Sequence, residues 1–325
     1  MWPLLRRAVF VTGVCAALLA QTADSHAAEC RTHAAQHLVR TAFKSWVEKS
    51  GSNCPSWFWL EKYNALYPRA DKGEEAIVLD VGCNAGYSSG KLIRAYMPEW
   101  GFGPRDIYAY VSQLPLEGLP KDQTCGACND CRENDAAALG TAPWPELIIH
   151  CFEPSKNHFL RLLASRAKFV PNHARRWHLH NVVVSSAPGL IRFPAEGCGE
   201  LCAVHDAQGS SVLGHDQTLA TSVDAFVAML PRQSPPPRMV LLKIDTEGHD
   251  AAVLQGAADA IRHGVFDIIT FEYGTTGSWA NTNLSSVVAR PGGLLSESAP
   301  YFCFYDGQGS AMPMSAGCFV DEMDV

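Results

Sequence analysis

Acidic and imidazole side chains crowd one short turn of the chain. The mostly apolar run Leu241–Ile244 is followed by Asp245, Glu247, His249 and Asp250. Such side chains can remove a proton from a hydroxyl, and grouped carboxylates can hold a divalent cation. Four ionisable groups in six residues favour a reactive or ligand-binding turn over a solvated loop.

The flanking residues place this turn at the end of a strand. The run Leu241–Ile244 shows no polar alternation, which is typical of a parallel strand covered on both faces. Val253, Leu254 and Ala257 then recur with the spacing of a helix. Because open α/β sheets bind ligands at the carboxyl ends of their strands, Asp245 and its neighbours are predicted to face a ligand.

A second apolar strand ends in a glycine-containing turn. Residues 77–81 lead into Gly82 and Gly86, which have the spacing Gly-x-x-x-Gly. Glycine permits a positive φ and a close approach of the backbone to a ligand. The nicotinamide-binding pattern Gly-x-Gly-x-x-Gly and the Gly-Lys-Ser/Thr phosphate loop are both absent from this turn.

A third strand is predicted just before Glu153. Residues 146–152 are largely apolar and end at this carboxylate, which can accept hydrogen bonds from both hydroxyls of a ribose. Ser155 is a suitable N-cap for a helix through Phe159 and Leu163. The three predicted strand ends therefore carry Gly82, Glu153 and Asp245.

Together these segments resemble the FkbM-type methyltransferases. The resemblance implies a class I methyltransferase fold, which is a Rossmann-like α/β fold with a mostly parallel sheet and helices on both faces. It also implies methyl transfer from S-adenosylmethionine, usually to a hydroxyl oxygen. The chain departs from the family in a link of about forty to fifty residues before the Glu153 strand, and in Cys83, where alanine is more usual. The matching motifs span roughly residues 75–275: Asp80–Ser88, Phe152–Pro154, Thr221–Asp224, Leu242–His249 and Phe271–Tyr273.

These turns supply the predicted site residues. Asp245 is expected to face both methyl donor and acceptor, and Glu247 and His249 are further candidates for the base or for orienting the acceptor. Alternatively, oxygens of Asp245, Glu247 and Glu272 could hold a divalent cation such as Mg²⁺ that acidifies the acceptor hydroxyl. The residues expected to bind the cofactor are Asp80, Gly82, Cys83, Asn84, Gly86, Tyr87, Glu153, Asn181 and Asp245.

Composition limits the class of protein and of partner. The 325 residues, 47% hydrophobic and 18% charged, describe a globular chain. We expect an N-terminal helical segment at 28–74 and a methyltransferase domain at 75–325, interrupted by a Cys-rich insertion at about 98–145. The net charge of −7 gives no support for a nucleic-acid partner. The resemblance, together with the N-terminal pattern described next, implies a glycan or a small metabolite as the acceptor. Nothing in the sequence indicates an oligomeric state.

Residues 1–27 have the pattern of a secretory signal peptide. Arg6 and Arg7 precede the apolar residues 8–20, a stretch too short for a comfortable membrane span. Ser25–Ala27 offers small residues for cleavage. The chain is therefore expected in the secretory pathway or outside the cell. The alternatives are an uncleaved type II anchor in the Golgi, which would attach the chain to a membrane, and a plastid-targeting signal.

Twelve cysteines agree with an oxidising compartment. Cys83 and Cys151 belong to core motifs and are expected to be small buried fillers. Cys125, Cys128 and Cys131 have the spacing of metal ligands, but no Cys or His follows at the next equivalent spacing. Cys151, Cys198, Cys202 or a histidine could supply the fourth zinc ligand after folding, but in a secreted chain disulfides are favoured.

Two other classes of function compete with an enzyme. One is a methyltransferase-like fold that has lost catalysis and binds glycans or proteins through its long loops. Gly82, Gly86, Glu153 and Asp245 argue against it, and a cofactor-binding assay separates the two. The other is a cysteine-rich structural module, which would not bind the cofactor and would unfold on reduction.

Overall fold

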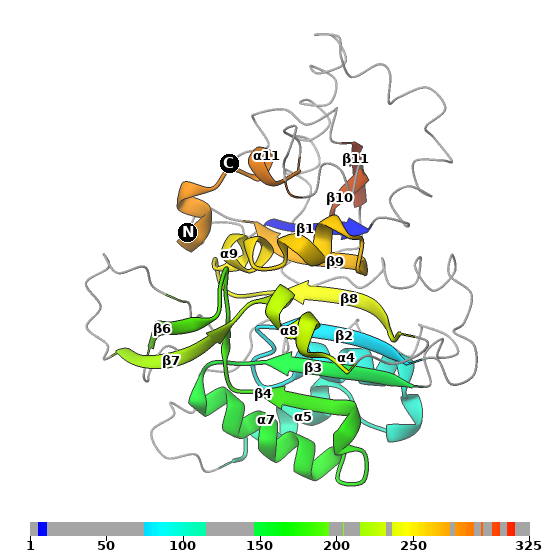
Figure 1. The fold of residues 1–325 in the computed structure, drawn as a ribbon. Coiled ribbons are helices and arrows are strands. Elements are labelled where there is room, and N and C mark those ends of the chain that lie inside the picture. Colours follow the sequence, from blue (N-terminus) through cyan, green and yellow to red (C-terminus); the bar gives the residue numbers. More distant parts are fainter. Residues whose placement is uncertain are drawn as a thin grey trace.

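The computed structural model describes residues 6–11, 75–114, 146–194, 204, 215–231, 236–273, 277–288, 294, 301–305 and 311–315. These residues form one large and one small sheet, with helices on both sides of the large one (Figure 1). The strands of the large sheet lie in the order β11 (Ala311–Ser315), β10 (Tyr301–Tyr305), β1 (Arg6–Val11), β9 (Phe266–Tyr273), β8 (Arg238–Ile244), β2 (Ala76–Val81), β3 (Leu147–Phe152) and β4 (Trp177–His180).

The five neighbouring strands β4, β3, β2, β8 and β9 are parallel. From β2 the chain continues to β3 and β4 on one side and later returns to β8 and β9 on the other. Such a change of direction leaves a crevice at the carboxyl ends of the strands, where open α/β sheets bind ligands. The arrangement confirms the predicted Rossmann-like α/β fold.

Both faces of the large sheet are covered by helices because its strands are apolar on both sides. Residues Ala76 and Val78 of β2 pack in a cluster with the helices α4 (Tyr87–Tyr96), α5 (Pro104–Val111) and α7 (Lys156–Phe169). The alternate residues Ile77, Leu79 and Val81 pack with α8 (Val223–Met229), α9 (Asp250–Gln255), α10 (Ala258–Arg262), the 3-10 helix η6 (Gly277–Asn281) and α11 (Leu284–Val288). In the described part of the chain, no helix is long and apolar enough to cross a membrane.

A small sheet projects beside the large one (Figure 1). It consists of β5 (Val183–Val184), β7 (His215–Thr221) and β6 (Gly189–Pro194), with β7 in the middle. Val183, Phe193 and Val204 form its buried cluster. Because β5 follows β4 after only two residues, this cluster is held close to the carboxyl end of the large sheet.

Part of the expected long insertion is helical. Residues 98–114 contain the 3-10 helix η2 (Pro98–Trp100) and α5, which packs against α4 and α7. Pro104 begins α5, and the Asp106 carboxylate accepts a hydrogen bond of 2.8 Å from the Gly103 amide. Ile107 and Val111 then bury one face. Gly103 and Pro104 therefore mark the start of a helix within this insertion.

Several predictions concern residues outside the described ranges. These are the N-terminal helical segment and the cluster Cys125, Cys128 and Cys131. Strand β1 lies within the segment predicted as a signal peptide, and it pairs antiparallel with β9 and β10. Cleavage after Ala27 would therefore remove one strand of the large sheet.

Candidate active site

A cleft lies where the ends of β2, β3 and β8 meet the small sheet. One wall is apolar and comes mainly from Val182–Val184, Phe193 and Val204. The other is polar and combines the glycine turn, Glu153 and the Asp245 turn. All the lining residues are Val81, Gly82, Asn84, Phe152, Glu153, Pro154, His158, Val182, Val183, Val184, Phe193, Val204, Asp245, Thr246, Glu247 and His249.

The glycine turn packs directly against the Asp245 turn. Gly82 has a φ of +74°, and a Cβ at this position would lie 1.8 Å from the Asp245 carbonyl oxygen. Gly86 has a φ of +97°, but its missing Cβ would meet Trp177 at 2.8 Å and Leu162 at 2.9 Å. Gly82 therefore permits contact between the two turns, whereas Gly86 permits packing of α4 on the core.

Asp80 anchors α4. Its side chain is fully buried, and its Oδ2 accepts hydrogen bonds of 2.7 Å from both the Ser88 and the Ser89 hydroxyls. These two serines belong to the first turn of α4. Asp80, one of the residues predicted to bind the cofactor, does not line the cleft, and it fixes the helix that follows the glycine turn.

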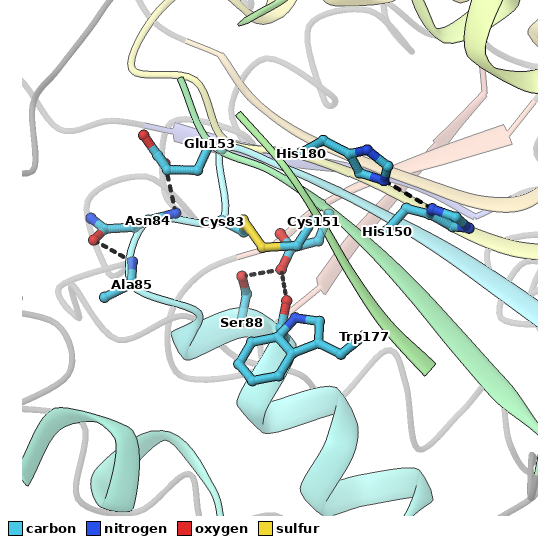
Figure 2. Close-up of a disulfide and its surroundings, with 12 residues drawn as sticks. Cys83, Asn84, Ala85, Ser88, His150, Cys151, Glu153, Trp177 and His180 are labelled. Carbon is cyan, nitrogen blue, oxygen red and sulfur yellow. Dashed lines mark hydrogen bonds between the residues drawn. A yellow bond between two sulfur atoms is a disulfide. The ribbon is translucent and has the colours of Figure 1, made fainter. Parts of the chain in front are cut away.

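Cys83 and Cys151 form a disulfide, with their Cα atoms 5.7 Å apart (Figure 2). Both cysteines are buried, as predicted, but they are bonded to each other and are not separate fillers. The amides of Gly82 and Cys83 donate to the Phe152 carbonyl at 3.0 and 3.3 Å, which folds the glycine turn over the end of β3. This fold brings together two cysteines that are 68 residues apart in sequence.

Glu153 lines the cleft, and two backbone amides hold its carboxylate in place. The Asn84 amide donates to Oε2 at 2.9 Å and the Ser155 amide donates to Oε1 at 2.8 Å. Burial raises the pKa of Glu153 to about 7, although the two amides and the Lys243 ammonium favour the ionised form. The Asn181 side chain donates to the Glu153 and Pro154 carbonyls at 2.8 and 3.1 Å, so its described contacts position Glu153.

The Asp245 turn has an unusual backbone. Glu247 has a φ of +54°, a conformation that is uncommon for residues other than glycine. Asp250 links this turn to β9, because its carboxylate accepts hydrogen bonds from the Thr246 hydroxyl at 2.7 Å and from the Glu272 amide at 3.0 Å. Burial raises the pKa of Asp250 to about 6. The His249 Nε2 lies 3.0 Å from the Ser185 Oγ, within hydrogen-bonding distance.

The predicted residues divide into two groups. The cleft is lined by Gly82, Asn84, Glu153, Asp245, Glu247 and His249. The predicted cofactor residues that do not line it are Asp80, Cys83, Gly86, Tyr87 and Asn181. Four of these five support the cleft through the contacts described above, whereas the Tyr87 ring lies 6.4 Å from that of Tyr108.

The acidic residues suggested for a divalent cation do not converge. Within the described ranges, three potential ligand atoms lie within 4.8 Å of one another only at Asp80, Cys83 and Cys151. The two cysteines there are joined as a disulfide. The arrangement of Asp245, Glu247 and Glu272 therefore gives no support to the predicted cation site.

The sequence did not predict roles for two ionisable residues at the cleft, His158, which lines it, and Lys243, which bridges the glycine turn and Asp245. His158 lines the cleft from the first turn of α7, and burial, reinforced by Arg161, lowers its pKa to about 4. The Lys243 Nζ lies 3.2 Å from Asp80 Oδ1, 3.4 Å from Asp245 Oδ2 and 3.0 Å from the Gly82 carbonyl oxygen. The sequence signals for Lys243 are a charge inside an otherwise apolar strand and its place in the motif Leu242–His249.

Comparison with known proteins agrees with the motifs. Residues 125–285, just under half of the chain, match the family model of the methyltransferase FkbM domain. The match begins after the glycine turn, which the fold brings beside the matched Glu153 and Asp245. No curated protein matches the chain.

The chain is also similar to a solved structure. The crystal structure of methyltransferase FkbM from Methylobacillus flagellatus KT aligns with a TM-score of 0.31 and 15% identity. The alignment covers 62% of this chain and 32% of that chain, so the present chain spans about a third of its length.

Proposed function

We propose, on the premise that residues 125–285 match the FkbM methyltransferase domain, that this chain methylates a hydroxyl oxygen of a glycan or small metabolite. The family match supports methyltransferase activity and implies S-adenosylmethionine as the methyl donor. The observation that carries the proposal is the convergence of Gly82, Glu153 and Asp245, from three strand ends, on one cleft.

The residues of the cleft fit this donor chemically. Glu153 presents a carboxylate that is fixed by the Asn84 and Ser155 amides, and each carboxylate oxygen can accept more than one hydrogen bond. It is suited to accept the two ribose hydroxyls. The apolar wall formed by Val182–Val184 and Phe193 is suited to a flat heterocyclic base. The glycine turn would hold the methionine part.

Asp245 is the residue that we assign to the acceptor proton. The donor supplies a methyl group on a positively charged sulfonium, so the chain needs mainly to align the acceptor oxygen for in-line displacement. Alignment can lower such a barrier by about 7–11 kcal/mol. A general base typically adds about 10²–10⁴ in rate. Glu247 and His249, on the same turn, would orient the acceptor.

We also propose that the chain enters the secretory pathway. The N-terminal pattern supports this proposal, and so does the Cys83–Cys151 disulfide, because such bonds persist in oxidising compartments. N-terminal sequencing of the protein secreted by expressing cells is expected to begin at Ala28. A chain that retains Met1 would contradict cleavage and would keep β1 in the mature sheet.

Binding of S-adenosylhomocysteine tests the cofactor assignment without knowledge of the acceptor. Glu153→Ala is expected to weaken calorimetric binding about tenfold or more, because a charge-assisted hydrogen bond contributes about 1.5–3 kcal/mol. Asp259→Ala is the matched control, since it removes an exposed carboxylate outside the cleft. If the folded wild type does not bind, the proposed methyltransferase function is overturned in favour of a non-catalytic binding or structural protein.

Methyl transfer tests the role of Asp245. Asp245→Asn and Glu247→Gln would be compared with the wild type for transfer of labelled methyl to a panel of saccharides and small alcohols, with and without Mg²⁺. Asp245→Asn is expected to lower the rate about 10²-fold or more. Wild-type rates in both variants would place the base elsewhere, and loss of wild-type activity on chelation would restore the cation hypothesis.

A further inference from the structure

Lys243 joins the two turns that form the polar wall of the cleft. It is the next-to-last residue of β8, and its side chain is 12% exposed. The ammonium lies between Asp80 Oδ1 at 3.2 Å and Asp245 Oδ2 at 3.4 Å, and it donates a hydrogen bond to the Gly82 carbonyl at 3.0 Å. The Lys243 ammonium therefore contacts Asp80 near the end of β2, Gly82 in the glycine turn, and Asp245, the proposed base.

The contact with Asp80 alone would make Lys243 a structural counter-ion. Asp80 is fully buried, and its other oxygen is already occupied by Ser88 and Ser89. A buried carboxylate without a cation is strongly destabilising. The contacts with Gly82 and Asp245 are different, because both of these residues line the cleft whereas Asp80 does not.

We propose that Lys243 is a positioning residue for methyl transfer. It holds the Gly82 carbonyl and the Asp245 carboxylate in their places at the cleft, and its charge offsets part of the negative charge that a bound sulfonium would meet. This inference rests on the proposed function. In this proposal Lys243 affects the binding of the methyl donor and also pairs with Asp80.

Two ligands separate the positioning effect from the charge effect. S-adenosylhomocysteine has a neutral sulfur, whereas S-adenosylmethionine carries a positive charge at the same atom. Loss of the hydrogen bond to Gly82 and of the contact with Asp245 should weaken the binding of both ligands. Loss of the ammonium also leaves the cleft more negative, which favours the cationic ligand. The ratio of the two affinities should therefore shift towards S-adenosylmethionine.

The experiment uses the full chain and the variants Lys243→Met, Asp80→Asn and Asp80→Asn/Lys243→Met. Thermal unfolding identifies the folded variants, and calorimetry measures the binding of both ligands. Lys243→Met is expected to weaken S-adenosylhomocysteine about tenfold, the effect of losing a hydrogen bond from a charged group. The affinity ratio is expected to shift roughly three- to tenfold towards S-adenosylmethionine, as for one charge nearby in a partly screened site.

The Asp80→Asn background provides the decisive comparison, because no buried carboxylate then needs the ammonium. In that background Lys243→Met should still weaken S-adenosylhomocysteine and shift the affinity ratio, even where it no longer lowers stability. If the double variant binds both ligands as Asp80→Asn does, Lys243 is only a counter-ion and the inference is overturned. Failure of the wild type to bind either ligand would instead overturn the proposed function.

Discussion

The backbone of Asp245 occupies the space that a side chain on Gly82 would need: a Cβ there would lie 1.8 Å from the Asp245 carbonyl oxygen. Gly82→Ala is therefore expected to separate the two turns, lower the free energy of unfolding and abolish S-adenosylhomocysteine binding. The φ of +74° adds its own cost, which is about 1–2 kcal/mol for a residue with a Cβ. Urea denaturation and calorimetry measure the two effects.

Gly101 provides the control for backbone conformation. It has a φ of +71°, and a Cβ there would meet nothing within 4 Å. Gly101→Ala should therefore lose only about 1–2 kcal/mol of stability, the cost of a left-handed conformation, and should retain ligand binding. Equal losses of stability in the two variants would contradict the importance of the Gly82–Asp245 contact.

The Cys83–Cys151 disulfide fastens the glycine turn to the end of β3. Cys83→Ala/Cys151→Ala is expected to lower the free energy of unfolding by about 2–5 kcal/mol, the usual cost of removing a native disulfide from a small domain. The binding of S-adenosylhomocysteine should weaken as well, because Asn84, the residue after Cys83, donates to Glu153. Denaturant titration and calorimetry provide the two readouts.

Peptide mapping tests the bond itself. Non-reducing digestion and mass spectrometry should recover a peptide pair linked through Cys83 and Cys151. A reductant that breaks this bond should lower the stability of the wild type by more than it lowers the stability of the double alanine variant, which lacks the bond. Alkylation of both cysteines in the unfolded, unreduced protein would show that they are free thiols.

The parallel sheet could be predicted because its strands are continuous apolar runs and their ends carry the polar residues. Gly82, Glu153 and Asp245 are each the first residue after such a run, so the rule that ligands bind at strand ends already placed them together. The helix α5 could not be predicted from the sequence, because the residues before and at its start, Gly101, Gly103 and Pro104, also favour a turn.

The disulfide and the role of Lys243 depend on register rather than on local sequence. Asp80 lies opposite Cys151 on one side and opposite Lys243 on the other, and these pairings join residues far apart in the chain. A shift of one residue would move each side chain to the other face of the sheet. Pattern and composition do not specify that register, so Cys83 and Cys151 resembled buried fillers and Lys243 had no assigned role.

Glu247 is held in a left-handed conformation at the cleft, and such strain is often retained for function. Glu247→Gly should relieve it and raise the free energy of unfolding by about 1 kcal/mol. The same change removes the carboxylate and should reduce methyl transfer. Glu247→Gln is the matched control, because it keeps the strained backbone and removes only the charge.

Thermal melts and the methyl-transfer assay distinguish the two contributions. Glu247→Gly should be more stable than Glu247→Gln, while both variants should be slower than the wild type. If Glu247→Gly melts at a lower temperature than Glu247→Gln, the conformation of residue 247 is not a source of strain. Wild-type rates in both variants would show that the carboxylate does not orient the acceptor.

The raised pKa of Glu153 predicts opposite effects of pH on stability and on ligand binding. Burial raises this pKa from 4.5 to about 7, so the folded protein binds the proton more tightly than the unfolded chain does. The resulting stabilisation is complete below pH 4.5 and is lost as the pH rises through about 7. Comparison with Glu153→Gln isolates this effect, because other titrating groups act equally in both proteins.

Ligand binding should follow the ionised form of Glu153, because a carboxylate accepts hydrogen bonds from ribose hydroxyls more strongly than a carboxylic acid does. The affinity of the wild type for S-adenosylhomocysteine should therefore fall as the pH is lowered through about 7, by up to about tenfold per pH unit below that value. Glu153→Gln cannot ionise at residue 153, so its weaker binding should vary much less with pH than that of the wild type between about 5.5 and 8. Calorimetry across this range decides the matter: parallel pH profiles for the two proteins would mean that Glu153 does not bind the ligand through its carboxylate.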